Sequence, residues 1–172
     1  MGKIFNNKGI VFWITGLSGS GKSTIGEKLK KLIEKHYGKT IIIHGDDIRE
    51  IYKNKSYSIK DRLNLGKSNS NLCKLISDQN INVIFTTVGL FHKLFNYNKK
   101  NLNNYFEIFI KSDIKKLIKN KKKTFYKEKT KNVWGIDLKP QYPKKPDIII
   151  KNNFDKTITY LAETIFKKIK KI

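Results

Sequence analysis

One stretch near the N-terminus limits what this chain can fold into. Residues 9–15 read GIVFWIT, a continuous run of apolar, β-branched and aromatic residues that is typical of a buried parallel strand. Residues 16–24 read GLSGSGKST, and the segment that follows carries apolar residues at helical spacing up to His36. A buried strand that leads through a glycine-rich turn into a helix predicts an α/β fold with a parallel sheet.

The glycine-rich stretch fits the pattern G-x-x-x-x-G-K-[ST] of a phosphate-binding loop, and a strand before it and a helix after it are the context that this pattern requires. Glycines let the backbone curl so that successive N–H groups face one anion, and the helix N-terminus adds a positive dipole. We therefore predict that the loop binds ATP, with Lys22 reaching the β- and γ-phosphates and Ser23 ligating Mg²⁺. The predicted ATP-binding residues are Gly16, Ser18, Gly19, Ser20, Gly21, Lys22, Ser23 and Thr24.

The rest of the chain alternates predicted strands and helices. Further strands are expected at Thr40–His44, Ile81–Val88, Tyr105–Lys111 and Asp147–Lys151, and further helices at Asp46–Tyr52, Asp61–Asn80 and Asp155–Ile172. Alternation of this kind predicts a five-stranded, mainly parallel sheet with helices on both faces. The length of 172 residues is that of one domain, which we place at residues 1–172.

Residues 115–131 form a lysine-rich segment with little apolar periodicity. One interpretation is a disordered charge run. The other is a short basic lid over the phosphate site, which we place at about residues 119–140. Pro140, Pro143 and Pro146 lie at or just beyond this segment and indicate an extended connection into the last strand.

The formal net charge of +23 is that of many nucleic-acid-binding proteins. Of the 37 basic residues, however, only Arg49 and Arg62 are arginine, and asparagine and isoleucine are abundant, which is the composition that an AT-rich genome encodes. We interpret much of the charge as codon bias on a solvated surface that also attracts phosphorylated substrates. Because the lysines are spread over the whole chain and no nucleic-acid-binding motif is present, we expect no specific nucleic-acid partner. A basic nucleic-acid-binding protein is the alternative from another class.

Cys73 is the single cysteine, so no internal disulfide can form, and such cysteine usage is typical of a reducing compartment. No apolar run approaches the length of a membrane span, and the N-terminal segment is better explained by a first strand than by a signal peptide. We therefore expect a cytoplasmic protein with no membrane partner.

No set of zinc ligands is apparent, and Cys73 is interpreted as a buried apolar residue within a helix.

Three later stretches indicate what receives the phosphoryl group. The chain is too short for most motor proteins and lacks the guanine-reading pattern N-K-x-D, which favours a small-molecule kinase. The stretches are HGDDIR at 44–49, YSIKDR at 57–62 and WGID at 134–137. The first follows the second predicted strand at the carboxyl edge of the sheet, where open α/β sheets bind ligands. Arg49 and Arg62 fall within these stretches, and the planar guanidinium suits bidentate contact with phosphate-like groups.

The loop and these three stretches, in this order over about residues 9–150, resemble the adenylyl-sulfate kinases. The resemblance implies a compact P-loop kinase fold with a mobile lid, commonly a homodimer. It also implies a nucleotide as the acceptor, because ATP in this family phosphorylates the 3′-hydroxyl of adenosine 5′-phosphosulfate.

The resemblance also implies roles for individual residues. Asp46 would lie near the accepting hydroxyl, where it could orient that hydroxyl, take its proton or hold Mg²⁺ through water. Arg49 and Arg62 would hold the phosphate–sulfate end of the acceptor. Tyr57 would stack on one face of the base, and Trp134 would either supply the second ring or pack in the core. Lys123 and Ile136 complete the candidate acceptor-binding residues.

The departures from the family pattern concern the acceptor. His44 stands where the family usually has aspartate, Leu65 where it has asparagine, and Val133 where it has the second phenylalanine of the base clamp. Two interpretations stay open. The chain is a divergent adenylyl-sulfate kinase, or it applies the same chemistry to cytidine diphosphoramidate, the acceptor of a related kinase and a precursor of capsule phosphoramidate groups. A nucleotide-binding protein with a damaged acceptor site and no catalysis is a further alternative.

Overall fold

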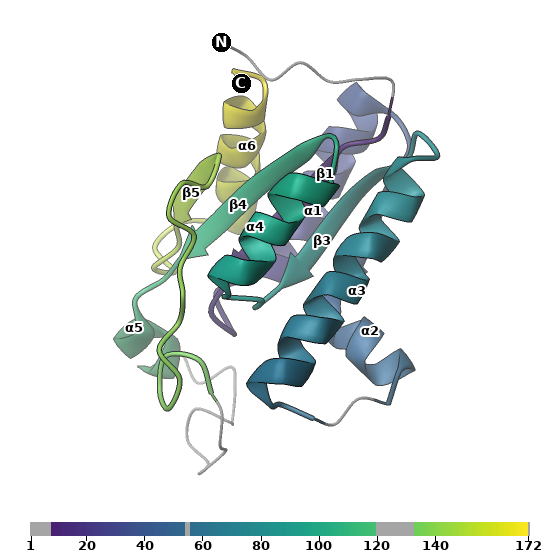
Figure 1. Cartoon of the computed structure of the whole chain (residues 1–172). Coiled ribbons are helices and arrows are strands. Elements are labelled where there is room, and N and C mark those ends of the chain that lie inside the picture. Colours follow the sequence, from purple (N-terminus) through teal and green to yellow (C-terminus); the bar gives the residue numbers. More distant parts are fainter. Residues whose placement is uncertain (1–7, 54–55, 120–132, 172) are drawn as a thin grey trace.

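A single parallel sheet organises the structure, a computed structural model that describes residues 8–53, 56–119 and 133–171. The strands are Val11–Gly16 (β1), Thr40–His44 (β2), Asn82–Thr87 (β3), Tyr105–Lys111 (β4) and Ile148–Lys151 (β5). Their order across the sheet is β2-β3-β1-β4-β5, and all four neighbouring pairs are parallel. The strand that leads into the glycine-rich loop therefore lies at the centre of the sheet (Figure 1).

Helices cover both faces of the sheet. Lys22–Tyr37 (α1) packs against Ile158–Ile169 (α6) on one face, and Ile59–Ser77 (α3) packs against His92–Asn101 (α4) on the other. Figure 1 shows α3 and α4 in front of the sheet and α1 and α6 behind it. Two short helices, Gly45–Ile51 (α2) and Ile114–Lys119 (α5), follow the carboxyl ends of β2 and β4.

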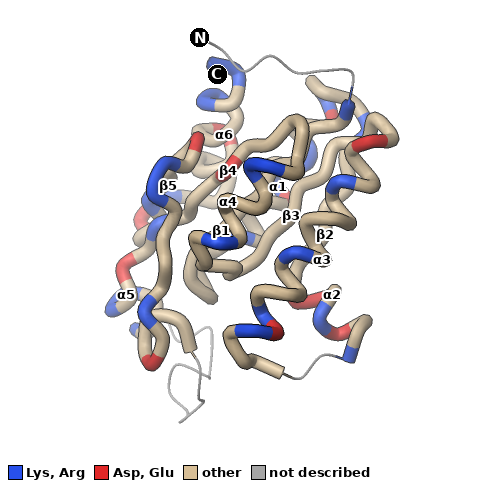
Figure 2. The backbone as a smooth tube through the Cα atoms, in the orientation of Figure 1, with Lys and Arg blue, Asp and Glu red and all other residues tan. Residues whose placement is uncertain are grey.

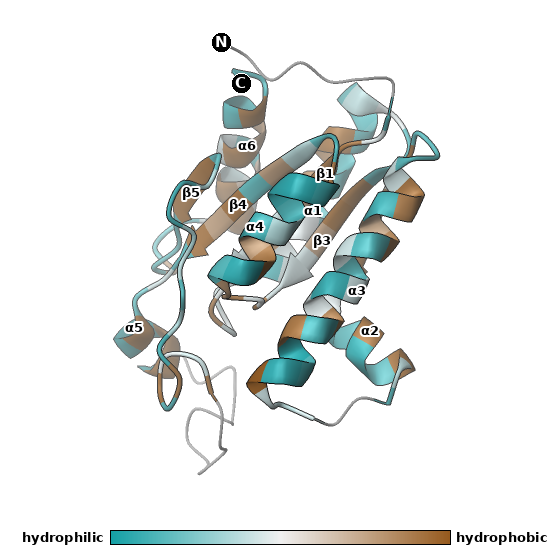
Figure 3. Cartoon of the chain, in the orientation of Figure 1, coloured by the Kyte–Doolittle hydropathy of each residue, from teal (hydrophilic) through white to brown (hydrophobic). Residues whose placement is uncertain are grey.

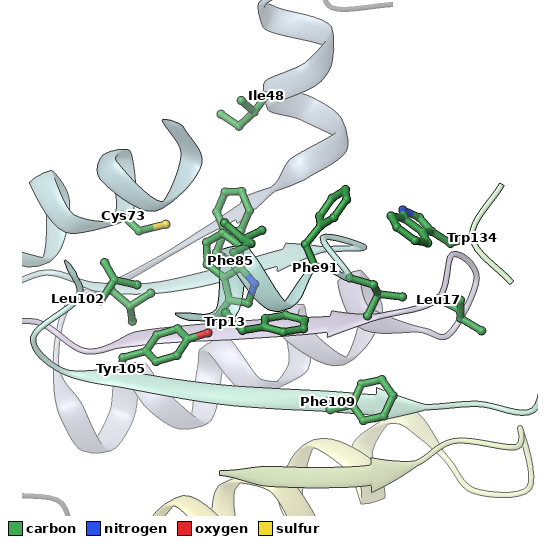
Figure 4. Close-up of a cluster of buried hydrophobic side chains, with 14 of the residues drawn as sticks. Trp13, Leu17, Ile48, Cys73, Phe85, Phe91, Leu102, Tyr105, Phe109 and Trp134 are labelled. Carbon is green, nitrogen blue, oxygen red and sulfur yellow. The ribbon is translucent and has the colours of Figure 1, made fainter. Parts of the chain in front are cut away.

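Alternation along β1 explains why the sheet is buried on both sides. Val11 and Trp13 point into the core cluster under α3 and α4, whereas Phe12 and Ile14 point into the cluster under α1 and α6. Trp13 stacks on Phe85 with ring centroids 4.6 Å apart, and both rings are inaccessible to solvent. Figure 4 shows this first cluster, and Figure 3 shows the largely hydrophilic outward face of α4.

The predicted α/β fold with five strands is confirmed, and two of the strands, Thr40–His44 and Tyr105–Lys111, occur at the predicted residues. The structure adds two helices, α4 and α5, that were not predicted. In α4 only Leu94, Phe95 and Asn98 are buried, which is too few for a clear apolar periodicity. Helix α5 begins the lysine-rich segment and buries Leu117 alone.

Most of the predicted lid, residues 120–132, lies outside the described residues. Lysine and arginine occur on every helix rather than in one stripe (Figure 2). In the described part of the chain, no helix is both long and apolar enough to cross a membrane.

Candidate functional site

The carboxyl ends of the strands converge on a cavity of about 320 Å³, which we call the loop cavity. It is the expected place for a ligand, because an open parallel sheet binds ligands outside these strand ends. The residues that line it are Ser18, Gly19, Gly21, Lys22, Ser23, Thr24, His44, Asp46, Thr86, Thr87, Val88, Asn152, Phe154 and Ile158. They come from the loop after β1, from the ends of β2, β3 and β5 or the residues just after them, and from the N-terminal ends of α1, α2 and α6.

The loop after β1 has the conformation that phosphate binding requires. Gly21 is the N-cap of α1 and has a φ of 87°, in the left-handed region that favours glycine. A Cβ at this position would lie 2.9 Å from Nδ2 of Asn152, so space as well as conformation requires glycine. The N–H groups at the start of α1 therefore face the cavity with the positive end of the helix dipole.

Lys22 lies at the first position of α1 with its side chain folded over the loop. Its Nζ donates a 2.8 Å hydrogen bond to the carbonyl oxygen of Leu17, and the residue is 8% exposed. A buried ammonium group beside backbone N–H groups creates a strongly positive environment. The loop cavity is thus suited to a polyphosphate.

Ser23 belongs to a chain of polar contacts that crosses to β2. Its hydroxyl lies 3.5 Å from the hydroxyl of Thr86, which lies 2.8 Å from Nδ1 of His44. The Nε2 atom of the same imidazole lies 3.1 Å from a carboxylate oxygen of Glu27 on α1. His44, which replaces the family's aspartate, is therefore held between Thr86 and Glu27.

The loop cavity contains oxygen ligands suited to Mg²⁺ but no preformed metal cluster. The hydroxyl of Ser23 and the carboxylate of Asp46 both line the cavity, and Mg²⁺ prefers oxygen ligands shared with substrate phosphates and water. Within the described ranges, no three His, Cys, Asp or Glu residues are grouped closely enough to hold a metal ion by themselves. The site thus fits a Mg²⁺ ion that arrives with a nucleotide.

A second, smaller cavity of about 90 Å³ adjoins the first, and we call it the arginine cavity. It is bounded by α2, α3, the end of β3 and the segment around Trp134. The residues that line it are Gly45, Asp46, Arg49, Tyr57, Arg62, Leu65, Gly66, Asn69, Thr87, Val88, Gly89, Phe91 and Trp134. Asp46, Thr87 and Val88 line both cavities, so the two share a wall.

The stretch YSIKDR forms the start of α3, and its spacing explains the geometry of this wall. Ser58 is the N-cap and accepts a 3.1 Å hydrogen bond from the backbone N–H of Asp61. The Asp61 carboxylate in turn accepts hydrogen bonds from the hydroxyls of Ser58 and Ser56, which lower its pKa. With Ser58 as the N-cap, Tyr57 is the residue just before the cap and Arg62 is the fourth residue of the helix. Side chains at these two positions are close together, as they are in a hydrophobic staple.

Both arginines of the chain contact the ring of Tyr57. The guanidinium carbons of Arg49 and Arg62 lie 4.6 and 5.0 Å from the ring centroid. Nε of Arg62 also donates to the Tyr57 carbonyl oxygen at 2.9 Å, and Nη1 of Arg49 donates to that of Ser56 at 2.7 Å. Burial and the neighbouring Arg49 lower the pKa of Arg62. Two cations held this close to each other favour an anionic ligand between them.

Trp134 closes the other side of the arginine cavity. Its ring lies 5.8 Å from the Arg62 guanidinium and meets the ring of Phe91 edge-on at 5.0 Å. It is 6% exposed and lies at the end of the first core cluster beside Leu17 (Figure 4). The indole therefore packs in the core and borders the cavity at the same time. Its stacking on a base stays a prediction. Val133 is buried and lines neither cavity.

Most of the predicted site residues come together around the two cavities. The loop residues from Ser18 to Thr24 line the loop cavity, except Ser20, which is fully buried beneath it. Gly16 is likewise absent from the lining. The arginine cavity is lined by the predicted residues Asp46, Arg49, Tyr57, Arg62 and Trp134. Ile136 is 50% exposed and lines neither cavity. Lys123 lies outside the described residues.

Seven residues that line the loop cavity were not among the predicted site residues: His44, Thr86, Thr87, Val88, Asn152, Phe154 and Ile158. All except Ile158 end or follow a parallel strand, and that position is the signal that could have identified them. Asn152 is buried, and its Nδ2 donates to the carbonyl oxygen of Ser20 at 3.0 Å, which ties the loop to the end of β5. Asn69 of α3 was also missed.

Comparisons with known proteins agree on one family. The family model described as adenylylsulphate kinase matches residues 8–151. The cytidine diphosphoramidate kinase of Campylobacter jejuni is 34% identical over 167 residues, which covers 95% of this chain and 98% of that protein. The adenylyl-sulfate kinase of Clostridium acetobutylicum is 35% identical over 160 residues, which covers 89% of this chain and 80% of that protein. The structure of the Mycobacterium tuberculosis APS kinase CysC in complex with AMPPNP and APS has the same fold, with a TM-score of 0.85 at 24% identity over 95% and 98% of the two chains.

Proposed function

The chain belongs to the adenylyl-sulfate kinase family, and we propose that it transfers the γ-phosphoryl group of ATP to the 3′-hydroxyl of a nucleotide. Its relatives are kinases, and they support the ATP-dependent kinase activity that the sequence predicts. The proposal concerns the acceptor and the residues that hold it.

The observation that carries the proposal is the position of Asp46 in the wall between the two cavities. A kinase must bring the donor phosphate and the acceptor hydroxyl together, since direct in-line transfer needs both oxygens aligned on one phosphorus. A polyphosphate in the loop cavity and a nucleotide in the arginine cavity would meet at this wall. The Asp46 carboxylate is then placed to orient the hydroxyl or accept its proton.

On the donor side, the loop N–H groups and Lys22 would bind the β- and γ-phosphates and stabilise the charge that develops during transfer. Ser23 and, through water, Asp46 would hold Mg²⁺, which supplies further neutralisation of phosphate charge when bound. Residues 119–140 would act as the basic lid that excludes water, the competing acceptor.

On the acceptor side, Tyr57 and Trp134 would stack on the base, and Arg49 and Arg62 would bind its 5′-phosphate chain. The Arg62 guanidinium lies 5.0 and 5.8 Å from the two rings, so a base and a phosphate bound here would be adjacent. Tyr57 is 50% exposed, which leaves this end of the cavity open to an entering ligand.

Among acceptors, we favour cytidine diphosphoramidate, with adenosine 5′-phosphosulfate as the alternative. Of the departures, Leu65 lines the arginine cavity and Val133 directly precedes Trp134, which also lines it, whereas His44 lines the loop cavity. The phosphate-binding loop itself fits its pattern completely. The relative named for the cytidine compound is also matched over 98% of its own length. A changed acceptor pocket beside an intact donor loop favours a changed acceptor.

Identification of the product tests the proposal. The protein is incubated with Mg²⁺, ATP and cytidine diphosphoramidate, and the product is examined by phosphorus NMR, with the 3′-deoxy acceptor as the matched control. We expect a new phosphomonoester at the ribose 3′ position and none with the 3′-deoxy compound. A product phosphorylated elsewhere, or formed equally from the 3′-deoxy compound, would contradict the proposal.

We also propose a homodimer, as the family resemblance implies. Light scattering of the purified protein should then give twice the 20.1 kDa of one chain. A mass of one chain at all concentrations would contradict it.

A further inference from the structure

Asn69 is a polar residue that the mechanism above does not use. It lies on α3, is 4% exposed and lines the arginine cavity. Across the described parts of the chain, its side-chain carboxamide forms no hydrogen bond with another protein group. The carboxamide therefore has its donors and its acceptor available to whatever occupies the cavity.

A buried carboxamide is costly unless it is hydrogen-bonded. It has two N–H donors and one oxygen acceptor, and each buried group without a partner loses the hydrogen bonds that it makes with water. Leucine or isoleucine would fill a purely structural position on this helix without that cost. Asn69 is largely buried and borders the cavity, so its carboxamide can donate hydrogen bonds to a polar ligand group there and accept them from it.

The order of residues along α3 indicates which part of the ligand reaches Asn69. The cavity-lining residues Arg62, Leu65, Gly66 and Asn69 follow one another along one side of the helix. At 1.5 Å per residue, Asn69 lies about 10 Å along the axis from Arg62. Tyr57 and Trp134, the rings placed to hold the base, both contact Arg62, so Asn69 lies toward the other end of the cavity.

The wall around this inner end is small and uncharged. A Cβ on Gly66 would lie 2.7 Å from Cδ2 of Leu94, and one on Gly89 would lie 3.1 Å from the same atom, so both glycines border the cavity beside Leu94. Neither Leu65 nor these glycines offers a polar side chain, but the hydroxyl of Thr87 borders the same end, 3.6 Å from the position of a Cβ on Gly89. Asn69 and Thr87 are consequently the side chains with hydrogen-bonding groups at this end, and Asn69 supplies the carboxamide.

We propose that the carboxamide of Asn69 contacts the terminal group of the acceptor, the group attached beyond its 5′-phosphate, and selects a phosphoramidate over a sulfate there. This inference rests on the proposed function. A phosphoramidate carries N–H donors as well as oxygen acceptors, so both ends of the carboxamide find partners. The sulfate of a phosphosulfate, which is joined to the phosphate as an anhydride, carries acceptors alone and leaves the carboxamide oxygen without a donor.

The test uses four acceptors that vary the base and the terminal group independently: the 5′-diphosphoramidates and the 5′-phosphosulfates of cytidine and adenosine. The values of kcat/KM are measured for the wild type, Asn69→Leu and the control Asn71→Ala, which changes an exposed residue of the same helix. Because each selectivity is a ratio within one preparation, a loss of folded protein cancels.

We expect Asn69→Leu to lower the phosphoramidate-to-sulfate ratio by about tenfold or more with both bases, because a site built to hydrogen-bond a group discriminates strongly against its analogue. The cytidine-to-adenosine ratio should stay unchanged, and Asn71→Ala should change neither ratio. A changed base ratio with a constant terminal-group ratio would overturn the inference in favour of base reading by Asn69. Two unchanged ratios would show that Asn69 does not contact the acceptor, while a wild type inactive on all four compounds would overturn the proposed function and the inference with it.

Discussion

The Nδ1 atom of His44 lies 2.8 Å from the hydroxyl of Thr86, and this contact connects the end of β2 to the end of β3 beside the phosphate-binding loop. The Thr86 hydroxyl lies 3.5 Å from that of Ser23. A neutral or cationic imidazole thus occupies the position at which a carboxylate would add negative charge next to the proposed Mg²⁺ ligand.

Replacing His44 by aspartate should strengthen Mg²⁺ binding and lower the Mg²⁺ concentration that activity needs. A carboxylate at position 44 would attract a Mg²⁺ ion held by Ser23. Because the two groups are separated by the Thr86 hydroxyl, solvent and salt would screen part of this attraction. We expect the Mg²⁺ concentration for half-maximal activity to fall roughly 3- to 10-fold. His36→Asp, which makes the same substitution at an exposed site in the last turn of α1, should leave it unchanged. An unchanged or increased Mg²⁺ requirement in His44→Asp would refute this account of the position.

Removing the Lys22 ammonium group should abolish most turnover while the fold is kept. Lys22→Ala removes the cation that would stabilise charge on the transferring phosphoryl group, so kcat should fall about a hundredfold or more. The matched control Lys35→Ala removes an exposed lysine of the same helix and should retain full activity. Circular dichroism checks that both variants are folded. Near-normal turnover in Lys22→Ala would rule out the role assigned to this residue.

Arg62→Lys should weaken acceptor binding and spare ATP binding. Lysine keeps the positive charge but loses the planar group that packs against Tyr57 and Trp134 and can bind phosphate with two parallel hydrogen bonds. Steady-state kinetics should show an acceptor KM raised about tenfold and an ATP KM within about twofold of the wild type. The opposite pattern would place Arg62 on the donor side.

Intrinsic fluorescence should report acceptor binding through Trp134. The chain has two tryptophans, and Trp13 is fully buried against Phe85, so it supplies a constant background. Stacking of a base on the Trp134 indole should quench emission when the acceptor is added without ATP. Trp134→Phe keeps an aromatic ring in the core and should remove the response. A response that persists in this variant would locate the base elsewhere.

The ion pairs of Asp78 predict how stability depends on acid. Lys74 and Lys8 hold its carboxylate at 2.6 and 2.8 Å and lower its pKa from 3.8 to about 2. The ionised form is therefore favoured in the folded state, so its contribution is present above about pH 3.8 and is lost as the pH falls toward 2. Urea unfolding should show a wild-type advantage over Asp78→Asn that narrows between pH 5 and pH 2.5. An advantage that grows in acid would reverse the assigned sign.

The parts of the fold that the sequence predicted are those with dense local signals. Strand β1 and the loop after it combine a continuous apolar run with a motif that requires a strand before it and a helix after it. The start of α3 also carries a local signal, because Ser58 and Asp61 are three residues apart, but the helix was predicted only from Asp61 and begins at Ile59. Helix α4 has no such signal, since most of its residues are polar and only Leu94, Phe95 and Asn98 are buried.

The parts of the site that were missed depend on contacts distant in sequence. Asn152 bonds to Ser20 across 132 positions, and Thr86 reaches His44 across 42. Neither pair has a spacing that a single sequence could reveal. Asn69 could not be distinguished from a surface residue, because its burial depends on the packing of α3 against α4. Only the assembled sheet and helices bring these side chains to the two cavities.

Donor and acceptor are proposed to meet at Asp46, and acceptor-dependent release of ADP is the measurement that checks this arrangement. The wild type and Asp46→Asn are assayed with Mg²⁺ and ATP, adding cytidine diphosphoramidate or adenosine 5′-phosphosulfate in parallel. The account predicts ADP release that depends on the acceptor, is faster with the cytidine compound and falls about a hundredfold in Asp46→Asn. Release that is independent of any acceptor, or unchanged in Asp46→Asn, would contradict it.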